Sequence, residues 1–300
     1  MALREARKAR KAERARSAER ARSAERAGKA ARGATVRRAR KALSRKREPP
    51  TTPHLSLVRA PRVLSDSGPM RRRISVATYN VHRWAGLKGR GAPDAARAGF
   101  VISELRADVI ALQEVLRPLR GEDPLEAIAD GLGLHVAFAS TRVHKRGELG
   151  NAILSRWPMA GVAVLDLSFS RMERRLAMVA QFRFEGGLLD VLATHLGLGD
   201  RTRQRQVRSL LDHPQFHDGP TILLGDMNAW RRCKATRTLD RELHHNLDWP
   251  PSFPSTRPVL ALDRVYSRGV RILEIDSHGS HAAKTASDHL PVVAHVELPA

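Results

Sequence analysis

Residues 221–228 read TILLGDMN, an apolar run of strand length that ends in a glycine, a carboxylate and an amide. The run is continuous rather than alternating, which is typical of a strand covered on both faces. Helical patterns at 94–106, 124–132 and 200–212 alternate with further runs of this kind. This mixture predicts an α/β layered sandwich. The further runs lie at 74–81, 108–115, 135–140, 150–157, 176–184, 188–196, 262–270 and 291–298.

Polar side chains stand where these apolar runs meet their loops. Strands of one sheet bring their ends to a shared rim, so we expect these side chains to converge. Each one alone also fits a turn, a cap or a satisfied structural histidine, but chance placement of all of them together is far less common. They are Asn80, Glu114, His195, Asp226, Asn228, Asp263, Asp288 and His289.

The chemistry of this set is coherent. The oxygens of Asn80, Glu114 and either Asp226 or Asp288 suit Mg²⁺ or Mn²⁺, which prefer carboxylates and water as ligands. Cys233 is the only cysteine of the chain, which excludes an internal disulfide and a cysteine-rich zinc site. Histidines without nearby cysteine suit proton transfer and phosphate contact better than a zinc cage.

A series of short motifs carries a resemblance to a known family. The motifs are TYN (78–80), LQEV (112–115), GNAILSR (150–156), THLGL (194–198), GDMNAW (225–230), LDRVYSRG (262–269) and SDHLPV (287–292). In chain order these motifs resemble those of the endonuclease/exonuclease/phosphatase superfamily, and within it a small bacterial subgroup. The resemblance covers about residues 74–298 and implies a four-layer α/β/β/α sandwich of two packed mixed sheets flanked by helices.

The resemblance also implies a reaction, the attack of water on the phosphorus of a phosphate ester. A divalent cation, Mg²⁺ or alternatively Mn²⁺, would offset the charge of the transition state. By resemblance, Glu114 with Asn80 nearby would hold the metal, and Asp288 would be a further carboxylate on the metal side.

The same resemblance assigns catalytic roles. Asp226 would orient or deprotonate the attacking water, and Asn228 would help to position the water or the phosphate. His289 would contact the phosphate or act as acid or base, with Asp263 fixing its tautomer and raising its pKa. His195 would donate to the phosphoryl oxygens or protonate the leaving group.

Further residues are candidates for supporting roles. By resemblance, Asn151 would contact the phosphate. Arg174 and Arg175 precede a predicted strand and are either phosphate contacts or plain surface charge. Arg203 and Gln206 follow His195 on a predicted helix and would brace its loop. Trp230 would stack a base, cover the rim of the site or pack in the interior.

The charge of the chain is concentrated near its N-terminus. Residues 1–50 hold 19 Lys and Arg against 5 Glu, a net of +14 within the +22 of the whole chain. The hexad repeat at 13–30 has no apolar residue larger than Ala, so a helix there has nothing to bury. We expect a disordered or loosely helical basic arm over 1–48, a proline-containing linker over 49–71 and the catalytic domain over 72–300.

The arm suits a polyanionic partner, either nucleic acid or acidic phospholipid. The plainer alternative is a solvated extension with no dedicated partner. No uninterrupted run of 18 apolar residues occurs, so we expect no transmembrane segment. The basic start is not followed by the apolar segment of a secretory signal, and we expect a monomer in the cytoplasm.

The substrate class stays open at this stage. The leading prediction is a magnesium-dependent, nuclease-type phosphodiesterase. The text LQEVLRP (112–118) lacks the lysine of the LQETK found in abasic-site endonucleases, which counts against a dedicated abasic-site repair enzyme. The alternatives are a phospholipid or phosphomonoester hydrolase at an acidic membrane surface, and a non-catalytic polyanion-binding protein that kept the fold.

Overall fold

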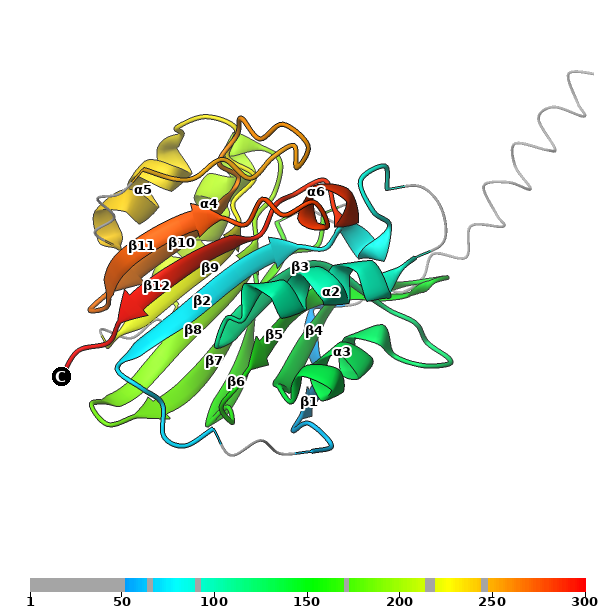
Figure 1. The fold of residues 1–300 in the computed structure, drawn as a ribbon. Helices are drawn as coiled ribbons and strands as arrows, with labels where there is room; N and C mark the ends of the chain where they lie inside the picture. The colour runs from blue at the N-terminus through cyan, green and yellow to red at the C-terminus, as the bar shows by residue number, and fades with distance from the viewer. Residues whose placement is uncertain (1–51, 64–66, 90–92, 170–172, 214–218, 244–247) are drawn as a thin grey trace, which may run out of the picture. The chain divides into compact units, whose positions relative to one another are not determined.

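A computed structural model of the chain describes residues 52–300 except 64–66, 90–92, 170–172, 214–218 and 244–247 (Figure 1). The predicted basic arm over 1–48 lies outside these described residues. Among the described residues, no helix is both long and apolar enough to cross a bilayer.

Two mixed sheets form the centre of the fold, as predicted. Only β2–β3 and β8–β9 pair in parallel; the other strand pairs of the described residues are antiparallel. The first sheet has seven strands in the order β1 (His54–Arg59), β4 (His135–His144), β5 (Gly147–Ser155), β3 (Val109–Arg117), β2 (Arg73–Asn80), β12 (Val292–Glu297) and β11 (Arg271–Ser277). The second has five in the order β10 (Asp263–Arg268), β9 (Thr221–Asp226), β8 (Gly187–His195), β7 (Leu176–Phe184) and β6 (Gly161–Asp166).

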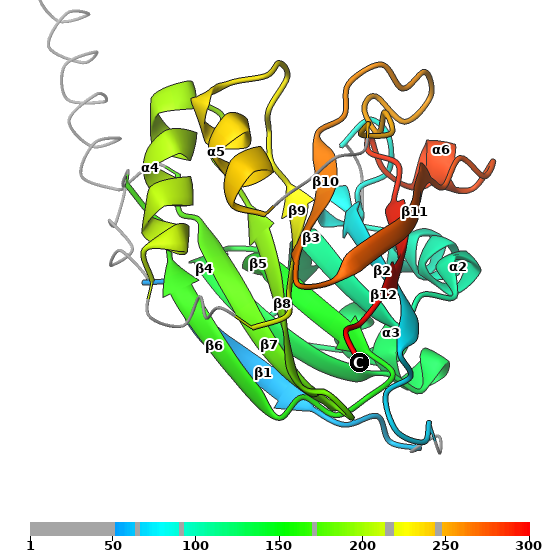
Figure 2. The same ribbon diagram turned by 90° about the vertical axis from the view of Figure 1, so that its left-hand side faces the viewer.

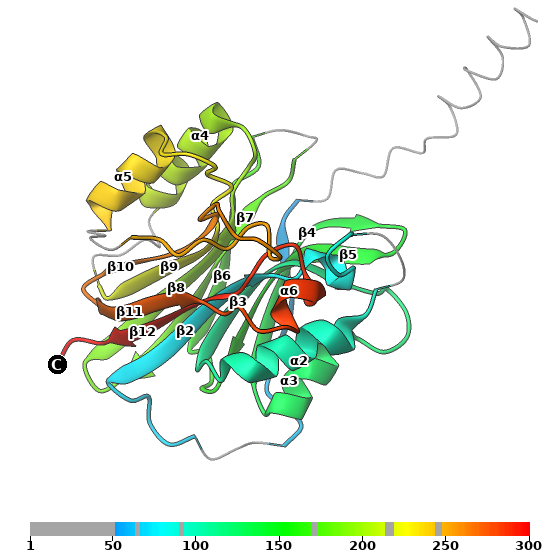
Figure 3. The ribbon, with the colours of Figure 1, turned by 45° about the horizontal axis from the view of Figure 1, so that its top comes forward.

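Helices cover the outer face of each sheet, which completes the predicted four layers. On the seven-stranded sheet lie α2 (Ala95–Leu105), α3 (Pro124–Leu132), the short η1 (His82–Trp84) and α6 (Ala283–Ala286) (Figure 1 and Figure 3). On the five-stranded sheet lie α4 (Asp200–Leu211) and α5 (Lys234–Glu242) (Figure 2). The helical patterns at 94–106, 124–132 and 200–212 therefore correspond to α2, α3 and α4.

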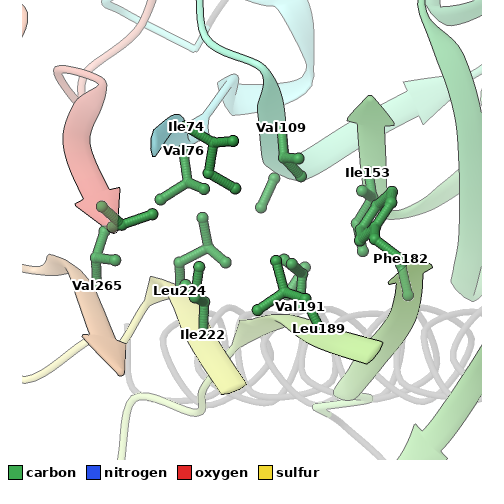
Figure 4. Close-up of a cluster of buried hydrophobic side chains, with 14 of the residues drawn as sticks. Ile74, Val76, Val109, Ile153, Phe182, Leu189, Val191, Ile222, Leu224 and Val265 are labelled. Carbon is green, nitrogen blue, oxygen red and sulfur yellow. The ribbon is translucent and has the colours of Figure 1, made fainter. Parts of the chain in front are cut away.

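The central core lies between the two sheets. Side chains of a strand point alternately to its two faces, so Ile74 and Val76 of β2 face the other sheet while Ala77 and Tyr79 face the helices. Figure 4 shows apolar side chains of both sheets meeting across this layer. The burial of both faces explains why these strands are continuous apolar runs rather than alternating ones.

One predicted boundary is wrong. Residues 54–59 lie within the segment 49–71 that we predicted to be a linker, yet they form β1, which pairs with β4 at the edge of the seven-stranded sheet. Pro53 and Pro61 flank this strand rather than interrupt it, so its backbone donors are intact, and an edge strand tolerates neighbouring proline. The folded unit therefore starts before Arg72.

Candidate active site

The register of the five-stranded sheet brings three of the predicted residues side by side. His195 ends β8 and pairs with Asp226 at the end of β9, and Asp226 pairs with Asp263 at the start of β10. The seven-stranded sheet presents Asn80 from the end of β2 at the same edge. Its Nδ2 donates to Asp226 Oδ2 across the two sheets over 3.1 Å. The predicted convergence of strand ends therefore holds for this group, which is buried.

His289 lies in the segment before β12 and forms a buried pair with Asp263. His289 Nδ1 lies 2.7 Å from Asp263 Oδ2, and Ser252 Oγ donates to the same oxygen over 2.6 Å. Burial disfavours the charged imidazole, but the carboxylates of Asp263 and Asp226 outweigh it and raise the pKa of His289 to about 10. The predicted role of Asp263 in orienting His289 thus has its geometry in place. The Nε2 atom of His289 faces Asp226 Oδ2 at 3.8 Å.

His195 has the opposite electrostatic environment. Its Nε2 lies 3.4 Å from Asp226 Oδ2, and its Nδ1 lies 3.5 Å from Nη1 of Arg175. Complete burial, together with the positive charges of Arg175 and His289, holds the pKa of His195 well below its usual value. Because a guanidinium can only donate, Nδ1 of His195 is the acceptor and the proton of the neutral ring is on Nε2.

Asp226 is the common partner of these groups. Its Oδ2 faces Asn80 and both histidines, while its Oδ1 accepts the backbone N–H of Asn228 over 2.8 Å. Burial, with a further contribution from the charge of Asp263, raises the pKa of Asp226 to about 6 even though His289 and the hydrogen bonds oppose this shift. A carboxylate with such a pKa is able to accept a proton near neutral pH.

The turn after β9 depends on its sequence. Gly225 has φ +148°, and a Cβ there would lie 1.9 Å from the carbonyl oxygen of Thr194 on the neighbouring β8, so only glycine fits beside that strand. Asn228 has φ +49°, a conformation that asparagine tolerates better than most residues. Its Nδ2 donates to the carbonyl of Leu196 over 2.8 Å, which ties this turn to the loop after His195.

Glu114 reaches the site through a bulge in β3. The pairing of β3 with β5 shifts register between Leu112 and Val115, and Glu114 has φ +54°. Its carboxylate faces Arg83 at 3.5 Å, and Asp288 Oδ1 lies 3.1 Å from His82 Nδ1. These groups line a cleft of about 250 Å³, whose other walls include Asn80, Thr141, Arg142, Leu149, Glu173, Arg174, Arg175 and His289.

Two groups of residues offer ligand atoms for a metal. Ligand atoms of Asp226, Asp263 and His289 lie within 4.8 Å of one another. In this group Asp263 Oδ2 already faces His289 Nδ1 and accepts from Ser252, while Asp263 Oδ1 is buried with no hydrogen-bond partner among the described residues. Glu114 and Asp288 instead present carboxylates to the cleft. Carboxylates in a site open to water fit Mg²⁺, which keeps several of its water ligands.

Asn80 is placed to assist on the metal side. Its amide orientation is fixed, because Nδ2 donates to Asp226 while Oδ1 accepts the backbone N–H of His82 over 3.0 Å. The side-chain oxygen therefore points away from Asp226 and retains one lone pair. The residues predicted for the metal thus fit a hard divalent cation.

The two predicted phosphate contacts differ in position. Arg174 lines the cleft. Asn151 lies in β5 opposite the bulge of β3, and its Nδ2 is buried with no hydrogen-bond partner among the described residues. A buried amide donor without a partner is costly, which is consistent with an anion completing its environment.

Other residues hold the loop that follows His195. Gln206 Oε1 accepts the backbone N–H of Gly197 over 2.8 Å, and Arg203 Nη1 donates to the carbonyls of Gly197 and Leu198. The bracing role predicted for Arg203 and Gln206 is confirmed. Trp230 does not pack in the interior, because it is 61% exposed with its ring 6.5 Å from that of Phe253.

Sequence reasoning missed several contributors to this site. No motif marks three of them. Ser252 lies between α5 and β10, His82 begins η1, and Arg142 lies toward the end of β4. Both predicted arginines, Arg174 and Arg175, line the cleft, and Arg175 is the one that reaches His195.

Comparison with known proteins agrees with this geometry. The model of the endonuclease/exonuclease/phosphatase family matches residues 77–289. The chain belongs to the endonuclease/exonuclease/phosphatase family. Among members, the uncharacterized protein YbhP of Escherichia coli strain K12 is 29% identical over 251 residues, covering 74% of this chain and 96% of YbhP.

Solved structures of the endonuclease/exonuclease/phosphatase family share the fold. A family member from Beutenbergia cavernae DSM 12333 superposes with a TM-score of 0.62 at 25% identity, over 76% of this chain and 72% of that one. The D. rerio TDP2 complexed with single strand DNA product gives a TM-score of 0.57 at 18% identity, over 76% and 100% of the two chains. The second likeness concerns the fold alone.

Proposed function

We propose that this chain is a divalent-metal-dependent phosphodiesterase. The observation that carries the proposal is the single buried oxygen, Oδ2 of Asp226, that faces Asn80, His195 and His289 at the edge of a cleft lined by Glu114. Members of the endonuclease/exonuclease/phosphatase family act on phosphoesters, and this site has a base, a charged proton donor and metal-competent carboxylates.

The metal would sit at Glu114 and Asp288 with Asn80 beside them. When bound, Mg²⁺ or Mn²⁺ supplies positive charge that offsets the negative charge of the transition state. These hard-oxygen donors suit either ion.

Hydrolysis then uses the chain's own groups. Asp226 accepts a proton from the water that attacks phosphorus, while Asn228 fixes the carboxylate by its backbone N–H. As the ester P–O bond breaks, the departing oxygen takes a proton from the His289 imidazolium, which Asp263 keeps charged. Neutral His195 donates from Nε2 toward the phosphoryl oxygens. Water thus adds across one P–O bond, and the products are a phosphomonoester and an alcohol.

Positive side chains around the cleft favour a charged diester. Arg83, Arg142, Arg174 and Arg175 all line it. Such a cleft suits two classes of diester. One is nucleic acid, which is the nuclease substrate predicted from the sequence, and the other is phospholipid. The basic arm would contact either polyanion in a salt-sensitive way, with the catalytic unit acting as a monomer.

Turnover of bis-(p-nitrophenyl) phosphate tests the proposal. We expect turnover with Mg²⁺ or Mn²⁺, its loss in EDTA, and a fall of about a hundredfold or more in Asp226→Asn. DNA, RNA and phospholipid in parallel reveal the substrate class. If no phosphoester is turned over in a metal-dependent way, the proposal fails and a non-catalytic polyanion-binding role takes its place.

A further inference from the structure

An apolar groove of about 900 Å³ lies on the outer side of the seven-stranded sheet, between α2 and α3. The two helices lie side by side over this sheet (Figure 1 and Figure 3). Small residues spaced three or four positions apart line this groove, so they lie on one face of each helix and leave space between the two helices. Its volume is in the range of about 300–1,000 Å³ typical of ligand pockets. The walls include Ala95, Ala96 and Gly99 of α2 and Ala127, Ile128 and Gly131 of α3.

A basic pocket connects this groove to the catalytic cleft. It has a volume of about 440 Å³ and shares Leu116 and Arg146 with the groove. At its other end it shares Arg83 and Arg142 with the cleft. Lys145 completes its basic lining. A ligand that starts at Glu114 therefore meets first a set of positive side chains and then an apolar surface.

This order of surfaces selects a ligand with an anionic end and an apolar end. Nucleic acid fits the basic pocket but not the groove, because its bases and sugars carry donors and acceptors that apolar walls leave without partners. An acyl chain carries no such groups, and each buried methylene adds to binding. A phospholipid has its phosphodiester and its acyl chains in the order that the protein offers.

We propose that the diester hydrolysed in the cleft is a glycerophospholipid, one of whose acyl chains lies in the groove between α2 and α3. This inference rests on the proposed phosphodiesterase function and narrows its substrate class. The lipid phosphate lies at Glu114 and His289, and the arginines that the basic pocket shares with the cleft offset its negative charge on the side from which the acyl chains leave. Water adds to phosphorus, one P–O bond breaks, and the products are a phosphomonoester and an alcohol, one of which retains the acyl chains.

The rim of the cleft supplies a second, independent observation. Single exposed apolar residues are ordinary, but here three stand next to residues that wall the cleft or that pack against the His289 ring. The backbone N–H of Leu198 donates to Glu173, and that of Val259 donates to the carbonyl of Phe253, whose ring lies 5.0 Å from the His289 ring. Clustered apolar groups of this kind mark contact with a membrane or a partner, and tryptophan favours the membrane interface. The three are Leu198, Trp230 and Val259, which are 63%, 61% and 70% exposed.

A series of soluble phosphatidylglycerols, from butanoyl to octanoyl chains and below their micelle concentrations, tests the proposal on the full chain. We expect kcat/KM to rise by up to about fourfold for each methylene that enters the groove. Ala127→Phe and Gly131→Leu should fill the groove and flatten this rise. A Cβ at Gly131 meets nothing within 4 Å, so that substitution is compatible with the fold. Thr238→Phe on α5, over the other sheet, is the matched control and should keep the rise.

Calorimetric binding of the same lipids in EDTA provides a readout that needs no turnover. We expect affinity to increase with chain length in the wild type and in Thr238→Phe, and to lose that increase in the two groove variants. Circular dichroism melting of each variant identifies one that fails to fold, and the remaining groove variant then decides.

The outcomes separate this inference from the proposed function. Turnover of bis-(p-nitrophenyl) phosphate without a chain-length effect on lipids overturns the lipid assignment and leaves the phosphodiesterase standing. Faster cleavage of single-stranded DNA or RNA oligomers than of the octanoyl lipid, unchanged in the groove variants, assigns nucleic acid instead. If no diester is hydrolysed, the proposed function fails. The calorimetric series then decides on the groove alone: affinity that increases with chain length supports acyl-chain binding there, and affinity independent of chain length refutes it.

Discussion

Replacing Asp263 with Asn tests the buried histidine pair at the centre of the proposed chemistry. The change keeps the size of the side chain but removes the carboxylate that lies 2.7 Å from His289 Nδ1. His289 then loses the largest of the negative charges that raise its pKa, so less of it is protonated when the leaving oxygen needs a proton. General acid catalysis contributes about 10²–10⁴ in rate, or about 2.7–5.4 kcal/mol. We expect kcat/KM with saturating Mg²⁺ to fall by that factor on DNA, RNA or phospholipid, whichever is hydrolysed, because the alkoxide leaving group of such a diester needs a proton.

Stability is the control for this variant. Asp263 is fully buried, so removal of its charge has two opposing effects on stability. The variant no longer bears the cost of desolvating a carboxylate, but it loses the ion pair with His289. We therefore expect the melting temperature to change by no more than about 4 °C. Asp190→Asn alters another buried carboxylate of the same sheet, near the opposite end of β8 from His195, and should leave turnover unchanged. An Asp263→Asn protein that melts normally and keeps a tenth or more of wild-type kcat/KM would remove His289 from the acid role.

Three further predictions concern the metal, a peripheral contact and the N-terminal segment. Glu114→Gln should raise the Mg²⁺ concentration for half-maximal turnover by about tenfold or more, and an unchanged titration would place the metal elsewhere. Burial would raise the pKa of Glu104, but hydrogen bonds from Ser280 Oγ and from His278 outweigh it and hold this pKa below its ordinary value. Glu104→Gln should therefore destabilise the fold by about 0.5–1 kcal/mol at neutral pH. This difference should be lost as the pH falls through the lowered pKa of Glu104. Urea titrations at neutral and at acidic pH measure the difference, and a constant difference would contradict the assignment. Deletion of residues 1–50 should leave the melting temperature unchanged and weaken polyanion binding in low salt. Deletion of residues 1–69 also removes β1 and should lower the melting temperature by at least about 4 °C. Equal melting temperatures of the two deletion variants would mean that β1 adds no stability.

The sequence revealed the interior of the fold better than its edges. Strands buried on both faces are continuous apolar runs, and β2 and β9 were found within a residue or two. The three strands that were missed, β1, β6 and β11, all lie at sheet edges, where one row of backbone groups has no partner strand and side chains are half exposed. An edge strand needs few apolar residues, so its pattern is weak.

The candidate site was predictable in its members but not in its geometry. Strand ends pointed to Asp226, Asp263 and His195, because neighbouring strands of one sheet share an edge. The bulge that turns Glu114 into the cleft is a backbone feature with no marker in its own sequence. The groove between α2 and α3 was also invisible, because alanine and glycine on a helix look the same whether a neighbour covers them or leaves them open.

The hydrogen bond from Asn80 to Asp226 joins the two sheets where the chemistry would take place. One sheet alone brings the amide and the Glu114 bulge, and the other brings His195 and the two central aspartates, so neither half is competent by itself. During refolding, the first appearance of turnover would therefore report when the two sheets have packed together.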